Sequence, residues 1–207
     1  MNKKLILITT VICILPMFLG ISLYDVLPDL IPAQWDFSGE VSSYMGKSSA
    51  VFYMPVFMAF LNLVVYVAIN SDPKKANQSV VLKRFTAFLV PAISVIFIPF
   101  SYLYALGVRI NIVPIAMLLI GIVFVCIGNY MPKCKQNYTM GIRVPWTLNS
   151  EENWNKTHRM AGYIWTVAGV LIIISTWFNM VYIIIPVIAV SAGAPIVYSY
   201  LLYRKGV

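Results

Sequence analysis

The sequence predicts an all-α, polytopic integral membrane protein with six transmembrane helices and both termini in the cytoplasm. Of its 207 residues, 60% are hydrophobic and only 11% are charged, and the mean hydropathy is +0.83. Soluble domains carry about 25% charged residues, so this composition excludes an ordinary soluble fold. Six apolar runs approach the roughly 20 residues that a membrane-spanning helix needs. They cover residues 5–24, 50–70, 86–107, 111–131, 161–179 and 181–203.

The distribution of basic residues predicts the orientation, because lysine and arginine concentrate in cytoplasmic loops. Of the 15 basic residues, all but Lys47 and Arg109 fall on the side of the two termini. The chain is therefore expected to be a single membrane domain, residues 1–207, with a cytosolic loop at 132–160 and an external loop at 25–49. The net charge of +8 is explained by this asymmetry, and no direct nucleic-acid partner is predicted.

The interiors of the predicted spans lack acidic and basic residues. Ion-coupled transporters usually carry such groups at mid-membrane depth, which disfavours an active transporter and leaves open a small facilitator or channel lined by hydroxyls and amides. Asn62 is the most polar residue at that depth, and we expect it to donate a hydrogen bond between helices. Four glycines are expected to mark close helix packing: Gly121, Gly162, Gly169 and Gly193.

Catalytic and metal chemistry have little support in the sequence. The three cysteines show no motif spacing, and a single histidine cannot supply a multi-ligand site, so neither a metal nor a cofactor is predicted. An enzyme reading would use His158 as general base with Glu151 or Glu152 as its orienting group. Glu151 precedes His158 by seven residues, about two helical turns, and no catalytic motif is present. We therefore predict a protein that is not an enzyme.

The external loop is acidic and carries turn signals. Pro28 and Pro32 disfavour helix at the residues before them, and Ser38-Gly39 is typical of a turn. Four acidic residues face the single Lys47 over residues 25–49. Trp35 and its apolar neighbours would place the loop against the headgroups or over the ends of the helices. Two interpretations follow: an interfacial lid, or a docking surface for a cationic or amphipathic external peptide.

The cytosolic loop concentrates aromatic and cationic residues. Asn149 and Glu152 resemble a capping box, which predicts a helix from about Ser150 into the fifth span. On that helix Trp154 and His158 share one face, and Glu152 can pair with Lys156. Pro145 and Gly141 are expected to keep the preceding segment out of helix and to fold Arg143 and Trp146 over the helix start. The cluster is either an interfacial anchor or a docking face for a cytosolic partner.

Two stretches of the sequence resemble motifs of the SdpI-like family of bacterial toxin-immunity membrane proteins. The first reads LPDLIPAQWDFSGEVSSYMGKSSAVFYMP from Leu27. Its matching positions are Leu27, Pro28, Ile31, Pro32, Trp35, Gly39, Lys47 and Pro55. Gln34 stands where the family has a histidine, and Ser42 where it has an aspartate. The second match comprises Gly128-Asn129-Tyr130, Asn137-Tyr138, Gly141-Ile142-Arg143, Pro145-Trp146-Thr147-Leu148, Trp154, Thr157-His158-Arg159 and Gly162.

The resemblance implies a function at the plasma membrane of a bacterium. It implies an immunity protein that protects its host from a secreted, membrane-active peptide toxin, and a signalling role in which the protein captures a cytosolic transcriptional repressor. From the predicted topology and the acidic face of the loop, the residues expected to recognise an external peptide are Pro28, Asp29, Pro32, Gln34, Trp35, Asp36, Glu40 and Lys47. The implied partner-binding residues of the cytosolic loop are Asn137, Tyr138, Gly141, Arg143, Pro145, Trp146, Trp154, Thr157, His158 and Arg159.

Overall fold

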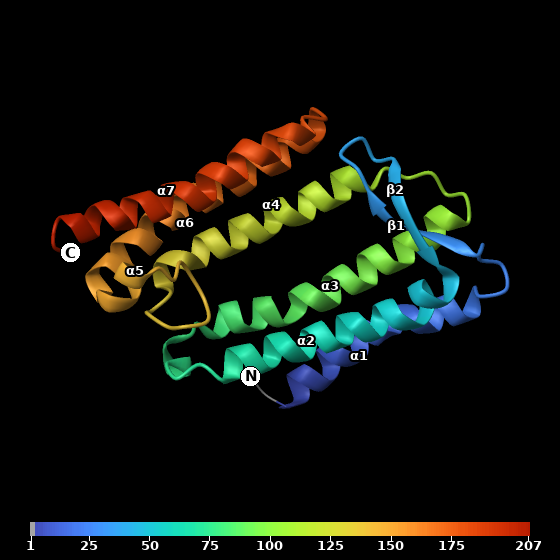
Figure 1. Cartoon of the computed structure of the whole chain (residues 1–207), viewed down its shortest axis with the longest axis horizontal. Coiled ribbons are helices and arrows are strands. Elements are labelled where there is room, and N and C mark those ends of the chain that lie inside the picture. The colour runs from blue at the N-terminus through green and yellow to red at the C-terminus, as the bar shows by residue number, and fades with distance from the viewer. Residues whose placement is uncertain (1–2) are drawn as a thin grey trace. The chain divides into compact units, whose positions relative to one another are not determined.

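The computed structural model describes residues 3–207, which form two compact units (Figure 1). Unit 1 comprises the chain up to Asn70 together with Lys83–Ile112, and unit 2 comprises Ser71–Leu82 and Val113–Val207. The single membrane domain expected for residues 1–207 stays a prediction. Six helices of the described chain are long and apolar enough to cross a membrane, which confirms the predicted number of spans. They are Lys3–Ser22, Ser49–Asn70, Val80–Ala105, Ile112–Lys133, Glu151–Trp177 and Val181–Arg204.

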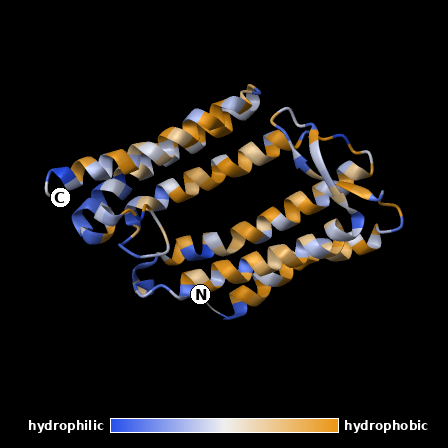
Figure 2. Ribbon diagram, viewed as in Figure 1, coloured by the Kyte–Doolittle hydropathy of each residue, from blue (hydrophilic) through white to orange (hydrophobic). Residues whose placement is uncertain are grey.

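The long helices expose many large apolar side chains. Figure 2 shows hydrophobic residues along all of them, while hydrophilic residues gather around the start of α6 and in the turn after α2. Leu7 is 67% exposed, Phe60 59% and Val167 58%, values that would be unfavourable in water. A lipid environment removes this cost, because acyl chains are as apolar as these side chains. The exposed apolar surface therefore agrees with a multi-pass membrane protein.

Unit 1 contains α1 (Lys3–Ser22), α2 (Met54–Asn70) and α3 (Val80–Ala105) from Lys83 onward. The Nδ2 of Asn62 on α2 donates to the hydroxyls of Thr9 (3.0 Å) and Thr10 (3.1 Å) on α1. The Ser94 hydroxyl on α3 donates to the Cys13 carbonyl on α1 (2.8 Å). These bonds confirm the interhelical role predicted for Asn62, and they satisfy polar groups that lipid cannot.

The segment between α1 and α2 forms a β-hairpin, which the all-α prediction missed. Strand β1 (Leu30–Trp35) pairs antiparallel with β2 (Val41–Gly46), with irregular register on either side of Gln34. The predicted Ser38-Gly39 turn is confirmed, since Gly39 has φ of 88° and its N–H donates to the Asp36 carbonyl (3.1 Å). The strands were hidden because Pro32 and the irregular register interrupt the alternation that marks a strand.

Unit 2 contains α4 (Ile112–Tyr130), the short α5 (Pro145–Asn149), α6 (Glu151–Trp177) and α7 (Ile184–Arg204). Helices α4 and α6 touch through glycines. A Cβ added to Gly121 would lie 2.9 Å from the Gly169 carbonyl oxygen, and one added to Gly128 would lie 2.9 Å from that of Gly162. The reciprocal distances, 2.6 and 2.8 Å, are equally short. Close packing is thus confirmed for Gly121, Gly162 and Gly169.

The prediction for Gly193 was wrong, since nothing lies within 4 Å of a Cβ added there. The tight connection predicted between the last two spans is confirmed. Phe178 ends α6, Asn179 adopts a left-handed conformation with φ of 54°, and the chain turns directly into a 3₁₀ turn at Val181–Ile183 and then α7. Asparagine is among the few residues besides glycine that adopt this conformation readily.

Two helices begin earlier than the predicted spans. Helix α3 begins at Val80 and not near residue 86, and α6 begins at Glu151, ten residues before the predicted fifth span. The extra turns carry charged residues such as Lys83 and Arg159, which end an apolar run without ending a helix. The expected continuation of a helix from about residue 150 into the fifth span is confirmed.

Candidate functional site

The α4–α6 connection, residues 131–150, is the first candidate region. After a 3₁₀ turn at Met131–Lys133, the chain runs without regular structure to Pro145, which begins α5. The prediction that Pro145 and Gly141 keep this segment out of helix is confirmed for residues 134–144 and was wrong for Pro145–Asn149, because proline is favoured at the first helical position. The predicted capping residue was also wrong by one: Ser150 accepts from the Asn153 N–H (3.1 Å) and caps α6.

Asn137 organises the irregular part of the connection. Its side chain is fully buried, and its Oδ1 accepts from the backbone N–H groups of Thr139 (3.0 Å) and Met140 (2.7 Å). Its Nδ2 donates to the Lys135 carbonyl (2.9 Å). Asparagine supplies both an acceptor and donors, so one buried side chain closes the loop on both sides. This residue holds the shape of the loop and presents no atom to a partner.

Trp154 and His158 lie beneath that loop on the buried face of α6. Their rings stack with centroids 3.9 Å apart and an interplanar angle of 19°. The Trp154 indole N–H donates to the Cys134 carbonyl (2.6 Å). Both side chains are buried, which confirms the shared helix face that the spacing predicted and removes both rings from any external contact surface.

The partners of His158 define its tautomer. Its Nε2 accepts from the Ile142 N–H (3.0 Å), and its Nδ1 lies 2.8 Å from the Trp154 carbonyl. An N–H can only donate, so Nε2 carries no proton and Nδ1 donates to the carbonyl. Gly141, with φ of 105°, passes directly over Nε2, so a Cβ there would collide with the ring. His158 is therefore a neutral structural residue with both nitrogens in use.

Asp72 is a central residue of this region that sequence reasoning missed. It is buried, and its Oδ2 accepts from the Tyr138 N–H (3.0 Å) and the Thr139 hydroxyl (2.6 Å). Its Oδ1 accepts from the Lys74 N–H (2.7 Å). Burial alone would raise the pKa of Asp72, but these bonds and one from Gln78 together lower it below its usual value. The available signal was a single acidic residue directly before Pro73 and close to Lys74 and Lys75.

Gln136 and Asn153 were also missed. Gln136 donates to the Thr147 and Leu148 carbonyls at the end of α5 (both 2.9 Å) and accepts from the Lys74 ammonium (2.6 Å). Asn153 accepts from the Ser199 hydroxyl (2.6 Å), which joins α6 to α7. Both are amides that bond to residues more than ten positions away, and a single sequence carries no sign of such pairs.

The predicted residues of this region divide by exposure. Asn137, Trp154, Thr157 and His158 are buried, whereas Tyr138, Gly141, Arg143, Pro145 and Arg159 are exposed. Arg143 donates to the Tyr138 carbonyl (2.6 Å), which orders two exposed residues together. Trp146 packs against Tyr200 and Tyr203 of α7, with ring centroids 5.5 and 6.0 Å away. The position predicted for Arg143 and Trp146 over the start of α6 stays a prediction.

The hairpin segment, residues 25–49, is the second candidate region. The Asp36 Oδ1 accepts from the Ser38 N–H (2.8 Å), the Ser38 hydroxyl (2.6 Å) and the Glu40 N–H (3.0 Å). The bond from the Ser38 hydroxyl is the main cause that lowers the pKa of Asp36 below its usual value. At the base of the hairpin Lys47 donates to the Tyr24 carbonyl (3.2 Å) and lies 3.7 Å from Asp29. These contacts give the segment a defined shape.

The inner side of the hairpin covers the helix ends of unit 1. Leu27 and Ile31 are buried in a cluster with Val51, Ile98 and Tyr102, which agrees with a loop that caps the helices. Pro32 is buried with them and Trp35 is half-buried. The remaining predicted residues point outward and are exposed: Pro28, Asp29, Gln34, Asp36 and Glu40. The region thus combines a packed underside with an acidic outer face.

Together these features define a multi-pass membrane protein with two ordered polar segments, one on each unit. Two family models match these same parts: the SdpI/YfhL protein family over residues 133–199, and a domain of unknown function (DUF1648) over residues 11–59. The chain is 30% identical over 206 residues to the Immunity protein SdpI of Bacillus subtilis (strain 168), covering 98% of this chain and 97% of that protein. No solved structure matches. The chain belongs to the SdpI family.

Proposed function

We propose that this chain is an immunity protein that sits in the bacterial plasma membrane and protects the cell from a secreted, membrane-active peptide toxin. The observation that carries the proposal is the similarity to an immunity protein along nearly the full length of both chains. The ordered hairpin supports it, since an external segment with a defined shape and an acidic face suits recognition of a cationic peptide. On the basis of the charge distribution, the hairpin faces outward and both termini face the cytosol.

A survival assay tests the proposal. A toxin-sensitive bacterium expressing the chain is exposed to culture supernatant of the bacterium that encodes it, and an empty vector serves as the control. We expect survival only with the chain. Two variants are compared in the same assay. Trp154→Ala removes a buried ring and should reduce survival, whereas Trp177→Ala removes a ring that is 76% exposed and should not. Equal killing of cells with and without the wild-type chain, at verified membrane expression, contradicts the proposal.

The proposed mode of action is binding rather than catalysis or transport. His158 has both nitrogens occupied, while Glu151 and Glu152 are exposed, so no acid–base pair is assembled around it. Asn62 uses its amide to hold α1 and α2 together, which supports a structural role over a place in a transport path. Toxin-independent ion flux through proteoliposomes containing the chain would favour the alternative, a small channel or transporter.

A second partner is proposed for the exposed part of the α4–α6 connection. Tyr138, Arg143, Pro145 and Arg159 offer an aromatic and cationic surface, which suits an acidic patch on a cytosolic repressor. Arg143→Ala together with Arg159→Ala should abolish co-purification of a cytosolic repressor that the wild-type chain retains, and should leave toxin survival unchanged. Retention of the repressor by this double variant, at wild-type level, contradicts the proposed surface.

A further inference from the structure

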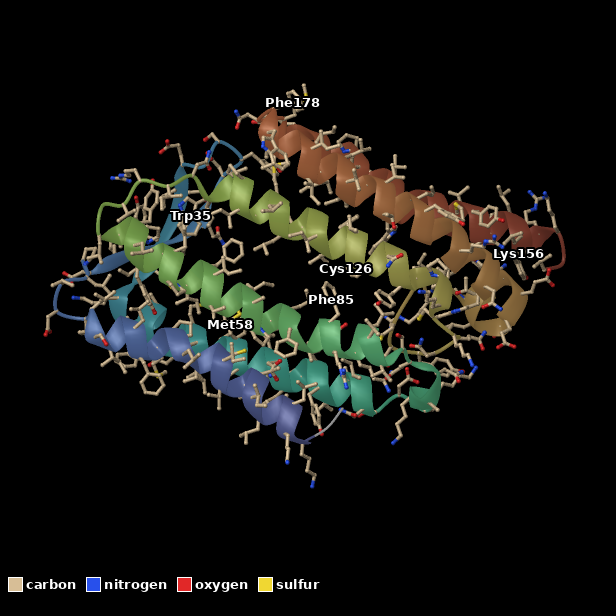
Figure 3. The ribbon with its side chains drawn as sticks, turned by 180° about the vertical axis from the view of Figure 1, so that it is seen from behind. Trp35, Met58, Phe85, Cys126, Lys156 and Phe178 are labelled. Carbon is tan, nitrogen blue, oxygen red and sulfur yellow. The ribbon has the colours of Figure 1, made fainter. Side chains whose placement is uncertain are left out.

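A cavity of about 260 Å³ lies within unit 1, directly under the hairpin. Its walls come from both strands, from the beginning of α2 and from α3. The lining residues that matter here are Pro32, Trp35, Met45, Met54, Met58 and Ser101. Trp35 and Met58 are labelled in Figure 3. Pockets for whole small molecules usually measure roughly 300–1,000 Å³, so this space suits one or two side chains of a larger ligand.

One residue of the cavity wall, Trp35, carries an unmet hydrogen-bond donor. The indole N–H of Trp35 is buried and has no partner anywhere in residues 3–207. The ring itself is well held, with edge-on contacts to Phe100 (5.4 Å) and Tyr104 (6.0 Å) on α3. By contrast, the Ser101 and Tyr102 hydroxyls donate to the carbonyls of Phe97 and Ala50. Buried donors are rarely left unpaired, so a ligand that opens the wall at Trp35 on entry would supply the acceptor that this N–H lacks.

The rest of the wall can adapt to an apolar guest. Met45, Met54 and Met58 are unbranched and flexible, and methionine-rich surfaces bind apolar peptide side chains of varied shape. A π-helix at Ser49–Tyr53 leads into α2 beside the cavity, with the Met54 N–H donating to the Ser49 carbonyl. Such wide turns occur often at functional sites. The cavity is thus lined by flexible apolar side chains and by the ring of Trp35, which is held in place.

Charge identifies the kind of occupant. Asp25, Asp36 and Glu40 are exposed around the hairpin, and the nearby Lys47 is already engaged with Tyr24 and Asp29. The exposed acidic side chains of the hairpin segment repel the headgroups of anionic lipids and attract a cationic peptide. A peptide also brings a backbone carbonyl next to each apolar side chain, which supplies the acceptor that Trp35 lacks.

We propose that this cavity receives an apolar side chain of the toxin, a cationic peptide, and that the Trp35 indole N–H donates to a backbone carbonyl of that peptide. The proposal rests on the immunity function proposed above and assigns it a recognition site. It places specificity on the hairpin of unit 1 and gives the outer acidic residues the role of attracting the peptide before it docks.

The test measures binding of the killing peptide, purified from the supernatant by its activity, to the full chain in phosphatidylcholine nanodiscs. Trp35→Phe removes the donor but keeps a ring, and we expect binding about 3- to 10-fold weaker. Its control, Trp177→Phe, changes an exposed ring on α6 and should have no effect. Ser101→Leu fills the cavity and should weaken binding about tenfold or more, whereas Ser101→Ala removes only the hydroxyl and should bind normally.

The outcomes separate the recognition site from the immunity function. Thermal unfolding of each variant in the same nanodiscs verifies that it is folded. If the wild type protects cells, and folded Trp35→Phe and Ser101→Leu bind the peptide as it does, the cavity proposal is overturned and the immunity proposal stands. If native mass spectrometry shows that these variants lose only a bound lipid, the occupant is lipid and the cavity proposal is again overturned. If the wild type neither binds nor protects, both proposals fail.

Discussion

Different interactions hold the hairpin segment of unit 1 and the α4–α6 connection of unit 2 in shape. The hairpin is held by backbone pairing between its strands and by one aspartate at its turn, and it leaves a cavity beneath it. The connection is held by buried side chains, namely Asp72, Gln136, Asn137, Trp154 and His158, whose polar atoms reach into its backbone. Backbone pairing leaves side chains available for a ligand, whereas side-chain pairing uses them for structure.

The largest effect should come from Trp154, the buried ring of α6 beneath the connection. Trp154→Ala removes the stack on His158 and leaves the Cys134 carbonyl without its donor. We expect a loss of about 3–5 kcal/mol in the free energy of unfolding, measured by thermal denaturation in detergent micelles. Trp177→Ala, at a 76% exposed position, should change it by about 0.5 kcal/mol or less. Equal effects of the two variants would show that the connection is not a folding core.

Asp72→Asn should have the next largest effect. In either orientation the NH2 group of the amide would face a backbone N–H, that of Lys74 or that of Tyr138, at a cost of about 1.5–3 kcal/mol. Because the folded pKa of Asp72 lies below its usual value, its contribution is complete above about pH 4 and disappears as the pH falls through the folded pKa. Unfolding midpoints of wild type and variant should therefore converge under acid conditions. A constant difference down to pH 2 would exclude an ionised Asp72.

A smaller and local effect is expected in the hairpin. Gly39→Ala places a Cβ on a residue with φ of 88° and against the Asn111 side chain, which should cost about 1–3 kcal/mol. Since the hairpin closes through its own backbone, hydrogen exchange should increase over residues 30–46 only. Gly46→Ala, with nothing within 4 Å of the added methyl group, should leave exchange unchanged. A rise in exchange that extends through α1 to α3 would remove the contrast between the two segments.

The smallest effect should come from an ion pair on the exposed surface of α6. Glu152 and Lys156 on α6 form an ion pair at 2.7 Å, but both side chains are well exposed. Glu152→Gln should reduce the free energy of unfolding by about 0.3–0.5 kcal/mol, and added salt should abolish the difference. A larger loss would show that exposed pairs contribute to the connection alongside its buried groups.

Features that depend on nearby residues could be predicted from the sequence. The six spans follow from runs of apolar residues, the Glu152–Lys156 pair from a spacing of four, and the buried face of Trp154 and His158 from helical periodicity. The hairpin turn could be predicted because serine and glycine favour turns locally. In each case the interacting groups lie within a few residues of one another.

Features that depend on distant partners could not be predicted. The bonds of Asp72 to Tyr138 and Thr139 span 66 and 67 residues, and that of Asn153 to Ser199 spans 46. The β-strands escaped detection because proline and two register irregularities break the period of two. The division of the predicted partner-binding residues into buried and exposed sets also required the fold, since neighbours such as Asn137 and Tyr138 differ completely in exposure.

The reciprocal glycines of α4 and α6 have a consequence for assembly in the bilayer. Gly121 faces Gly169 and Gly128 faces Gly162, so the helices run antiparallel with two contact points seven residues apart. Sliding one helix by seven residues would keep one glycine pair and press a larger side chain into the place of the other. Only one alignment lets both carbonyls approach the opposite Cα–H groups. The two pairs therefore fix the lengthwise alignment of α4 and α6 without any contribution from the polar residues of the connection.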